Sequence, residues 1–100
     1  MRLALSAVLL MAFVSGTRAH QAASGWDYSP SCCSNLDCRE VSSDAIKESP
    51  NGYVIKTTHE VLGYNDPRLR ESPDGEYHWC SVGGLPDSRT VCLYRPMPAY

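Results

Sequence analysis

The sequence predicts a small, mostly β domain that is stapled by disulfides, with three to five short antiparallel strands, one short helical turn and long loops; an α+β fold is the alternative. Two turns of the type Pro-Asn-Gly or Pro-Asp-Gly each precede a run rich in β-branched or aromatic residues. The chain has 100 residues and five cysteines. Only twelve Val, Ile and Leu residues follow position 19. A core of that size rarely supplies more than about 3–5 kcal/mol, so the fold needs covalent cross-links.

The first 19 residues are typical of a secretory signal peptide. Arg2 gives a positive start, residues 3–14 form a short apolar run, and Thr17 and Ala19 are the small residues that signal peptidase requires before its cleavage site. The apolar run is too short for a membrane-spanning helix, which needs about 20 residues. We therefore expect a mature chain that begins at His20, lies in the periplasm or is secreted, and has no membrane attachment after cleavage.

The mature chain is expected to form a single domain. Residues 20–31 are predicted to be a flexible polar segment, residues 32–95 the disulfide-stabilised domain, and residues 96–100 an extended tail that contains two prolines. The predicted elements are a strand at 39–41, one or two helical turns at 42–48 after a serine cap, a strand at 53–56, an extended stretch at 57–62, a turn at 65–67, a strand at 76–80, and a loop at 82–88 that makes a hairpin with a strand at 91–94.

The charge of the mature chain excludes several classes of partner. Without residues 1–19 the chain has seven basic and eleven acidic residues, a net charge of −4. Nucleic-acid binding draws its affinity from clustered Lys and Arg, and no such cluster occurs in this sequence. We therefore expect neither nucleic acid nor an anionic membrane as a partner.

The five cysteines predict two intramolecular disulfides and one cysteine left over. Cys80 and Cys92 fall opposite one another if the last hairpin turns at Pro86, so a cross-strand Cys80–Cys92 disulfide is expected. The second disulfide is expected to join Cys38 to either Cys32 or Cys33. A leftover thiol at Cys32 or Cys33 would be exposed and would favour a covalent dimer, unless it is buried and inert. The spacing fits neither a structural zinc site nor a Cys-x-x-Cys redox centre.

These cysteines also carry a resemblance. The pattern Cys32-Cys33-x4-Cys38, then Ser72-Pro73-Asp74-Gly75-x-Tyr77-His78-x-Cys80, then Cys92-Leu93-Tyr94, resembles a group of small exported bacterial proteins found largely among alphaproteobacteria. The resemblance covers nearly the whole mature chain. It implies an exported location and a shared cysteine pattern, and it implies no activity.

Three histidines define the sharpest chemical hypothesis. A free α-amino group at His20, together with its imidazole, can chelate Cu(II), and His59 and His78 could complete a Cu(II) or Zn(II) site. The simpler interpretation, which we favour, places His20 on a frayed terminus and the other two histidines in ordinary strands. The sequence therefore predicts no cofactor, with this metal site as the alternative.

A binding surface is the favoured interpretation of the large and basic residues. Four rings are hard to bury together in so small a domain, and Trp and Tyr are common interface anchors. Arg68 and Arg70 alternate along an extended stretch and could contact an anion. The candidate surface thus comprises Trp26, Tyr28, Tyr77, Trp79, Arg68 and Arg70.

No motif of a known catalytic class occurs in the sequence, and a cysteine nucleophile paired with His59 or His78 would have little room for a closed cleft. We therefore expect an exported, non-catalytic domain that binds a protein or small-molecule partner.

Overall fold

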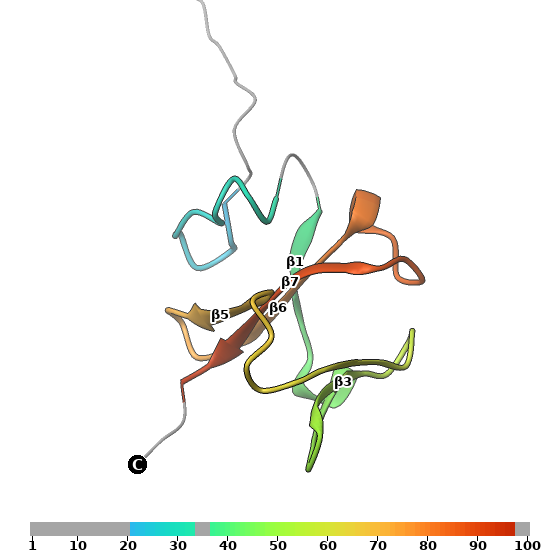
Figure 1. Ribbon diagram of the computed structural model, residues 1–100. Helices are drawn as coiled ribbons and strands as arrows, with labels where there is room; N and C mark the ends of the chain where they lie inside the picture. The colour runs from blue at the N-terminus through green and yellow to red at the C-terminus, as the bar shows by residue number, and fades with distance from the viewer. Residues whose placement is uncertain (1–20, 34–36, 98–100) are drawn as a thin grey trace, which may run out of the picture.

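Seven strands form two sheets in the part of the chain that the structure, a computed structural model, describes: residues 21–33 and 37–97 (Figure 1). The strands are β1 (Cys38–Val41), β2 (Ile46–Ser49), β3 (Gly52–Ile55), β4 (Glu60–Leu62), β5 (Leu69–Ser72), β6 (Tyr77–Ser81) and β7 (Thr90–Pro96), and the 3-10 helices are η1 (Ser43–Ala45) and η2 (Val82–Gly84). The predicted mostly β, disulfide-stapled class is confirmed. The strands are more numerous than the three to five expected, because short strands lie in segments that the sequence presents as loop or helix.

The larger sheet has the strand order β1-β6-β7-β5. Strands β6 and β7 form the predicted hairpin, and β1 pairs with β6 in the antiparallel sense. Strand β5 pairs with β7 in parallel, contrary to the expectation of antiparallel strands throughout. Because β7 lies between β5 and β6, the turn after β5 crosses the end of β7 before β6 begins. Strand β6 lies in the interior of the sheet, and all five of its residues are buried.

The smaller sheet, β2-β3-β4, is antiparallel, and the predicted Pro-Asn-Gly turn joins β2 to β3. Gly52 has a φ of 141°, which few other residues adopt, and a Cβ there would collide with the carbonyl oxygen of Leu62. Glycine is therefore required for β3 to lie this close to β4. The predicted helix at 42–48 is shorter than expected: η1 has the serine cap, with Asp44 N donating to Ser42 Oγ, but β2 starts at Ile46 because Ile46 and its neighbours pair with β3.

Two apolar clusters occupy the two faces of the larger sheet. Neighbouring β6 residues alternate between them, so that Trp79 faces the smaller sheet while His78 and Cys80 face the other way. The cluster between the sheets comprises Ile46, Tyr53, Ile55, Leu62, Tyr77, Trp79 and Leu93. The cluster on the opposite face comprises Ala22, Tyr28, Cys32, Cys33, Cys38, Cys80, Cys92 and Tyr94.

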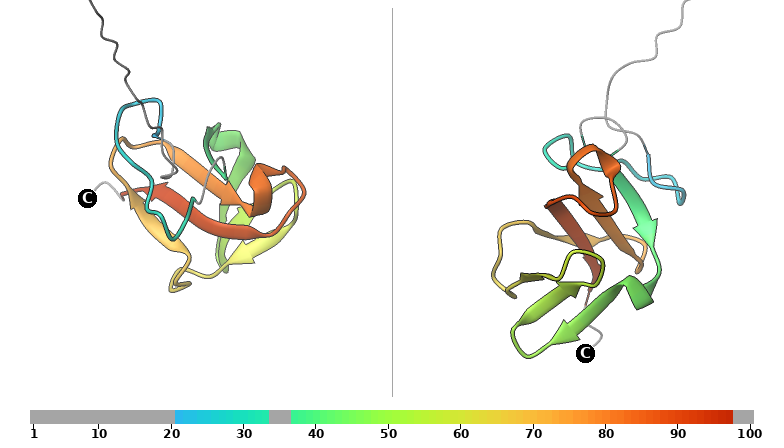
Figure 2. Two further views of the ribbon diagram at one scale, coloured as in Figure 1. Left: turned by 90° about the horizontal axis from the view of Figure 1, so that it is seen from above. Right: turned by 90° about the vertical axis from the view of Figure 1, so that its right-hand side faces the viewer.

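Residues 21–33, here called the N-terminal layer, cover this second face of the larger sheet (Figure 2). Ala22 and Tyr28 are buried, and a bridge between Gln21 and Asp27 closes a small loop. The flexible segment expected over residues 20–31 is thus an ordered third layer from residue 21 onward. The predicted signal peptide, His20 and the last three residues of the tail lie outside the described residues.

The two disulfides join Cys32 to Cys92 and Cys38 to Cys80, and the predicted Cys80–Cys92 pairing is wrong. Cys80 and Cys92 do lie opposite one another in the β6–β7 register, as expected. However, β1 places Cys38 opposite Cys80 on the other side of β6, and the N-terminal layer brings Cys32 to Cys92. The expected link from Cys38 to Cys32 or Cys33 is wrong for the same reason. Each disulfide therefore joins segments that are distant in sequence, with separations of 60 and 42 residues.

Cys33 takes part in neither disulfide and is buried in the same cluster as the four bonded cysteines. The structure thus has the buried thiol that was the alternative to an exposed one. None of the described residues belongs to a helix that is long and apolar enough to cross a bilayer.

Candidate functional site

The predicted aromatic surface lies in the interior. Tyr28, Tyr77 and Trp79 are at most 7% exposed, and Trp26 is partly buried against the second cluster. The prediction that these rings form an open binding face is therefore wrong. The physical reason is the small number of aliphatic residues, because the rings supply the apolar volume that those residues cannot.

The two predicted arginines have separate partners. Arg68 donates to both carboxylate oxygens of Asp66, at 3.0 and 2.8 Å, and lies 3.8 Å from Glu60. Hydrogen bonding to Asp66 raises the pKa of Arg68, and the same bond lowers the pKa of Asp66. Arg68 is therefore committed to carboxylates of its own chain. Arg70 instead contacts the N-terminal layer, where its Nη2 donates to Ser31 Oγ at 3.4 Å.

A polar network centred on Asp74 joins the N-terminal layer, the turn before β6 and β6 itself. Asp74 lies in the turn before β6, and its two oxygens accept hydrogen bonds from three segments. Trp26 Nε1 and Ser24 Oγ of the N-terminal layer donate to Oδ2 at 3.1 and 2.6 Å. Ser72 Oγ and the Glu76 backbone N donate to Oδ1 at 2.7 and 3.0 Å. This carboxylate therefore ties the N-terminal layer to the turn.

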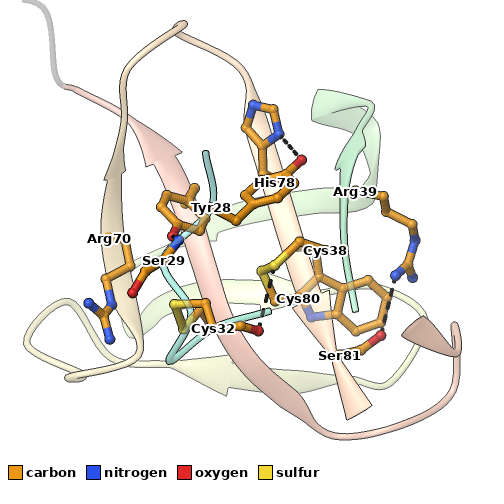
Figure 3. Close-up of a disulfide and its surroundings, with 12 residues drawn as sticks. Tyr28, Ser29, Cys32, Cys38, Arg39, Arg70, His78, Cys80 and Ser81 are labelled. Carbon is orange, nitrogen blue, oxygen red and sulfur yellow. Dashed lines mark hydrogen bonds between the residues drawn. A yellow bond between two sulfur atoms is a disulfide. The ribbon is translucent and has the colours of Figure 1, made fainter. Parts of the chain in front are cut away.

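His78 extends the network across β6. Its Nε2 lies 2.9 and 3.0 Å from the two oxygens of Asp74. Its Nδ1 lies 2.8 Å from the Tyr28 hydroxyl (Figure 3). The imidazole is completely buried, and the rings of Trp26, Tyr28 and Tyr94 lie around it with centroid distances of 4.9, 5.5 and 6.3 Å. Both ring nitrogens therefore have hydrogen-bond partners, as buried polar atoms usually do.

The electrostatics of the network define its protonation. Burial raises the pKa of Asp74, but the hydrogen bonds from Ser24, Trp26, His78 and Ser72 outweigh burial and hold the pKa well below its usual range. An ionised carboxylate only accepts hydrogen bonds, so Nε2 of His78 carries a proton. In the neutral ring Nδ1 then accepts the hydroxyl proton of Tyr28. Burial, followed by the nearby Cys33 and Asp74, raises the pKa of Tyr28 to about 12, which keeps that proton in place.

His78 also belongs to a group with the composition of a metal site. Glu40 of β1 lies opposite His78 of β6 in the strand register, and Asp74 lies four residues before His78. One ligand atom from each of these three residues lies within 4.8 Å of the other two. The alternative metal set considered from the sequence, His20, His59 and His78, is different: His20 lies outside the described residues, and His59 is exposed in the turn before β4. The structure thus places His78 with carboxylates rather than with His59.

The exposed apolar residues lie elsewhere, and two of them share the loop between β6 and β7. Val82 and Leu85 are 43% and 55% exposed. The other large apolar residues with high exposure are Val61, Tyr64 and Met97. The loop itself is tightly bonded, since Ser81 Oγ donates to Leu85 O at 2.8 Å and Ser88 Oγ donates to Val82 O at 2.6 Å.

Sequence reasoning missed Asp74, Glu40 and the exposed loop. Asp74 has the sequence context of a turn residue, and only its spacing of four residues from His78 could have indicated a contact between the two side chains. Glu40 joins the group through the pairing of β1 with β6, which no local pattern reveals. Val82 and Leu85 resemble core residues in hydropathy, although the glycines between them are typical of a surface loop.

Comparisons with protein-family models, with curated proteins and with solved structures give no match to this chain.

Proposed function

We propose that the protein is an exported, disulfide-stabilised domain that binds a protein partner through the loop between β6 and β7 and does not catalyse a reaction. Export is supported by the signal-like first 19 residues and by two disulfides, which persist in oxidising compartments. A binding role without chemistry is supported by the burial of Cys33, because a thiol that is completely buried has no direct path to a substrate.

The observation that carries the proposal is the exposure of Val82 and Leu85 on an ordered loop. Isolated exposed apolar residues are common on protein surfaces, but Val82 and Leu85 lie on the same short loop. The backbone is fixed by Leu85 N donating to Val82 O at 3.3 Å and by Val82 N donating to Arg89 O at 3.0 Å. A preorganised loop loses little entropy when a partner binds, so more of the contact energy becomes affinity.

The composition of the loop indicates the chemistry of the partner surface. Arg89 and Asp87 are exposed beside Val82 and Leu85. Apolar side chains flanked by charges of both signs match a protein surface with an apolar depression and a polar rim. A membrane surface would instead favour a cluster of basic residues, and the loop has none.

Site-specific photocrosslinking tests this proposal in cells that produce the protein. A photoreactive phenylalanine analogue replaces Leu85, and the matched control carries it at the exposed Lys56, in the turn between β3 and β4. We expect a discrete protein adduct from position 85, identified by mass spectrometry, that is absent from position 56 and is lost when Val82→Asp is added. The same adducts from both positions, or none from position 85, would exclude the loop as the binding surface.

A separate measurement tests export. The intact mass of the protein recovered outside the cytoplasm is expected to correspond to a chain that begins at His20 and contains two disulfides. A mass that includes residues 1–19 would show that the N-terminal segment is not a cleaved signal.

A further inference from the structure

We propose that Glu40, Asp74 and His78 bind one divalent transition-metal ion on the β1 side of the larger sheet. This site is independent of the loop proposed for protein binding. It rests on three side chains from two strands and a turn whose ligand atoms lie within 4.8 Å of one another.

The orientation of His78 is suited to a metal ligand. Its ring is buried among aromatic side chains, so it cannot rotate away, and Nε2 points at the carboxylate of Asp74. The opposite nitrogen is held by Tyr28 at 2.8 Å. Metal-binding histidines almost always have such a partner on the second nitrogen, and it fixes the ring and the tautomer.

Asp74 is held in a similar way. Ser24 and Trp26 donate to one of its oxygens, and Ser72 and the Glu76 backbone donate to the other. Ligating carboxylates are commonly oriented by hydrogen bonds of this kind. These four donors occupy most of the capacity of the carboxylate, so Asp74 binds the ion through the position that the imidazole N–H occupies in the structure.

Glu40 completes the site from the solvent side. It is exposed on the edge strand β1, directly opposite His78, and none of the ion pairs among the described residues involves it. With Asp74 it provides two negative charges, which a divalent ion neutralises. One imidazole and two carboxylates are a donor set that suits Zn²⁺ and the neighbouring divalent ions, with the remaining positions taken by water.

Metal binding changes the tautomer of His78. Nε2 must release its proton to water to bind the ion, and Nδ1, which carries no proton before binding, takes one up from water, so the ring stays neutral. The Nδ1–H then donates to the Tyr28 oxygen, and the Tyr28 hydroxyl, which keeps its proton, rotates its O–H away from Nδ1. The count of protons on the imidazole stays the same, and the change of tautomer is the signature that distinguishes ligation by His78 from binding elsewhere.

The test uses Zn²⁺ and the untagged mature protein. Glu40→Gln removes one ligand while leaving the exposed edge strand intact. Glu71→Gln is the matched control, because Glu71 is an exposed glutamate on β5, the other edge strand of the same sheet. Competition with a chromogenic chelator gives the Zn²⁺ affinity, NMR of the imidazole nitrogens gives the tautomer of His78, and circular dichroism verifies that both variants are folded.

We expect one Zn²⁺ per chain, a loss of affinity of at least about tenfold in Glu40→Gln, and an unchanged affinity in Glu71→Gln. We also expect the proton of His78 to move from Nε2 to Nδ1 when Zn²⁺ is added. Absence of binding, equal affinity of the two variants, or an unchanged His78 tautomer would each overturn the site, and binding with unchanged His78 would place the ion elsewhere on the chain.

Discussion

Asp74 shows how one side chain can carry two roles that the sequence does not separate. As the third residue of a Ser-Pro-Asp-Gly turn, it accepts a bond from the Glu76 backbone, as turn aspartates commonly do. The same carboxylate also holds Ser24 and Trp26, about 50 residues earlier in the chain. The turn could be predicted from the sequence. The long-range bonds could not, because they depend on where the N-terminal layer packs.

Replacement of Asp74 by asparagine is expected to destabilise the fold by about 3 kcal/mol. The amide can accept on one side only, so its NH₂ group must face one pair of existing donors, and the bonds lost are of the stronger, charge-assisted kind. The measurement is urea unfolding of the oxidised protein. The control is Asp87→Asn on the exposed β6–β7 loop, which should change the stability by less than about 0.5 kcal/mol. Similar curves for both variants would show that the network contributes little.

The low pKa of Asp74 predicts a loss of stability in acid. Its pKa is lower in the folded chain than in the unfolded chain, where it is about 3.9, so the unfolded chain binds the proton first as the pH falls. The contribution is complete above about pH 5 and is lost progressively below about pH 4. Asp66 acts in the same direction through Arg68.

The measurement is the free energy of unfolding between about pH 7 and pH 2. Asp74→Asn should flatten the acid limb without abolishing it, since Asp66 remains, whereas Asp87→Asn should leave the limb as in the wild type. An acid limb that is equally steep in all three proteins would assign the effect to other groups.

At the scale of the elements, most local predictions are correct, but the assembly of the elements differs from the prediction. The sequence predicted the β6–β7 hairpin, the turn at Gly52 and the register that sets Cys80 opposite Cys92, all of which are confirmed. The order of the strands could not be predicted from the sequence, because β6 is buried on both faces and shows no alternation of polar and apolar residues. Because β1 pairs with the other edge of β6, Cys80 is bonded to Cys38, and Cys92 is bonded to Cys32 instead.

The disulfide pairing predicts a specific pattern of non-additive effects. Cys38→Ser and Cys80→Ser break the same bond, so the double variant should be no less stable than either single variant. The chain-entropy model gives about 4 kcal/mol for a loop of this length. Cys80→Ser combined with Cys92→Ser removes both disulfides and should leave the domain largely unfolded. If that second pair instead behaved like a single variant, Cys80 and Cys92 would be bonded to each other.

At the scale of the molecule, the described residues form a stack of three layers, and the N-terminal layer is the irregular one. The smaller sheet covers one face of the larger sheet, and the N-terminal layer covers the other (Figure 2). The sequence presented this layer as a polar, flexible lead, because its few apolar residues follow no strand or helix periodicity. Its order comes from long-range attachments: the Cys32–Cys92 disulfide, the bonds to Asp74, and the Ser29 backbone N that donates to Tyr94 Oη at 2.8 Å.

The two sheets have a link of their own that does not involve the N-terminal layer. Glu60 of β4 accepts hydrogen bonds from the backbone N and the hydroxyl of Thr90 at the start of β7, and Trp79 Nε1 donates to the same hydroxyl at 2.8 Å. The cluster between the sheets is therefore expected to survive changes in the N-terminal layer. This separation allows the contribution of each face to be measured within one protein.

A truncated variant that begins at Ser31 should consequently be destabilised only on the face of the larger sheet that the N-terminal layer covers. It lacks Trp26 and Tyr28 but keeps Cys32 and its disulfide, and loss of a buried aromatic side chain commonly costs about 3–5 kcal/mol. Hydrogen exchange measures the outcome residue by residue. We expect faster exchange for the backbone amides of β1 and for the N-terminal half of β6, beside the uncovered His78, and little change in β3, which is covered by the cluster between the sheets. Uniform acceleration in both sheets would mean that the domain unfolds as a single unit, and unchanged exchange would mean that the N-terminal layer adds no stability to the face it covers.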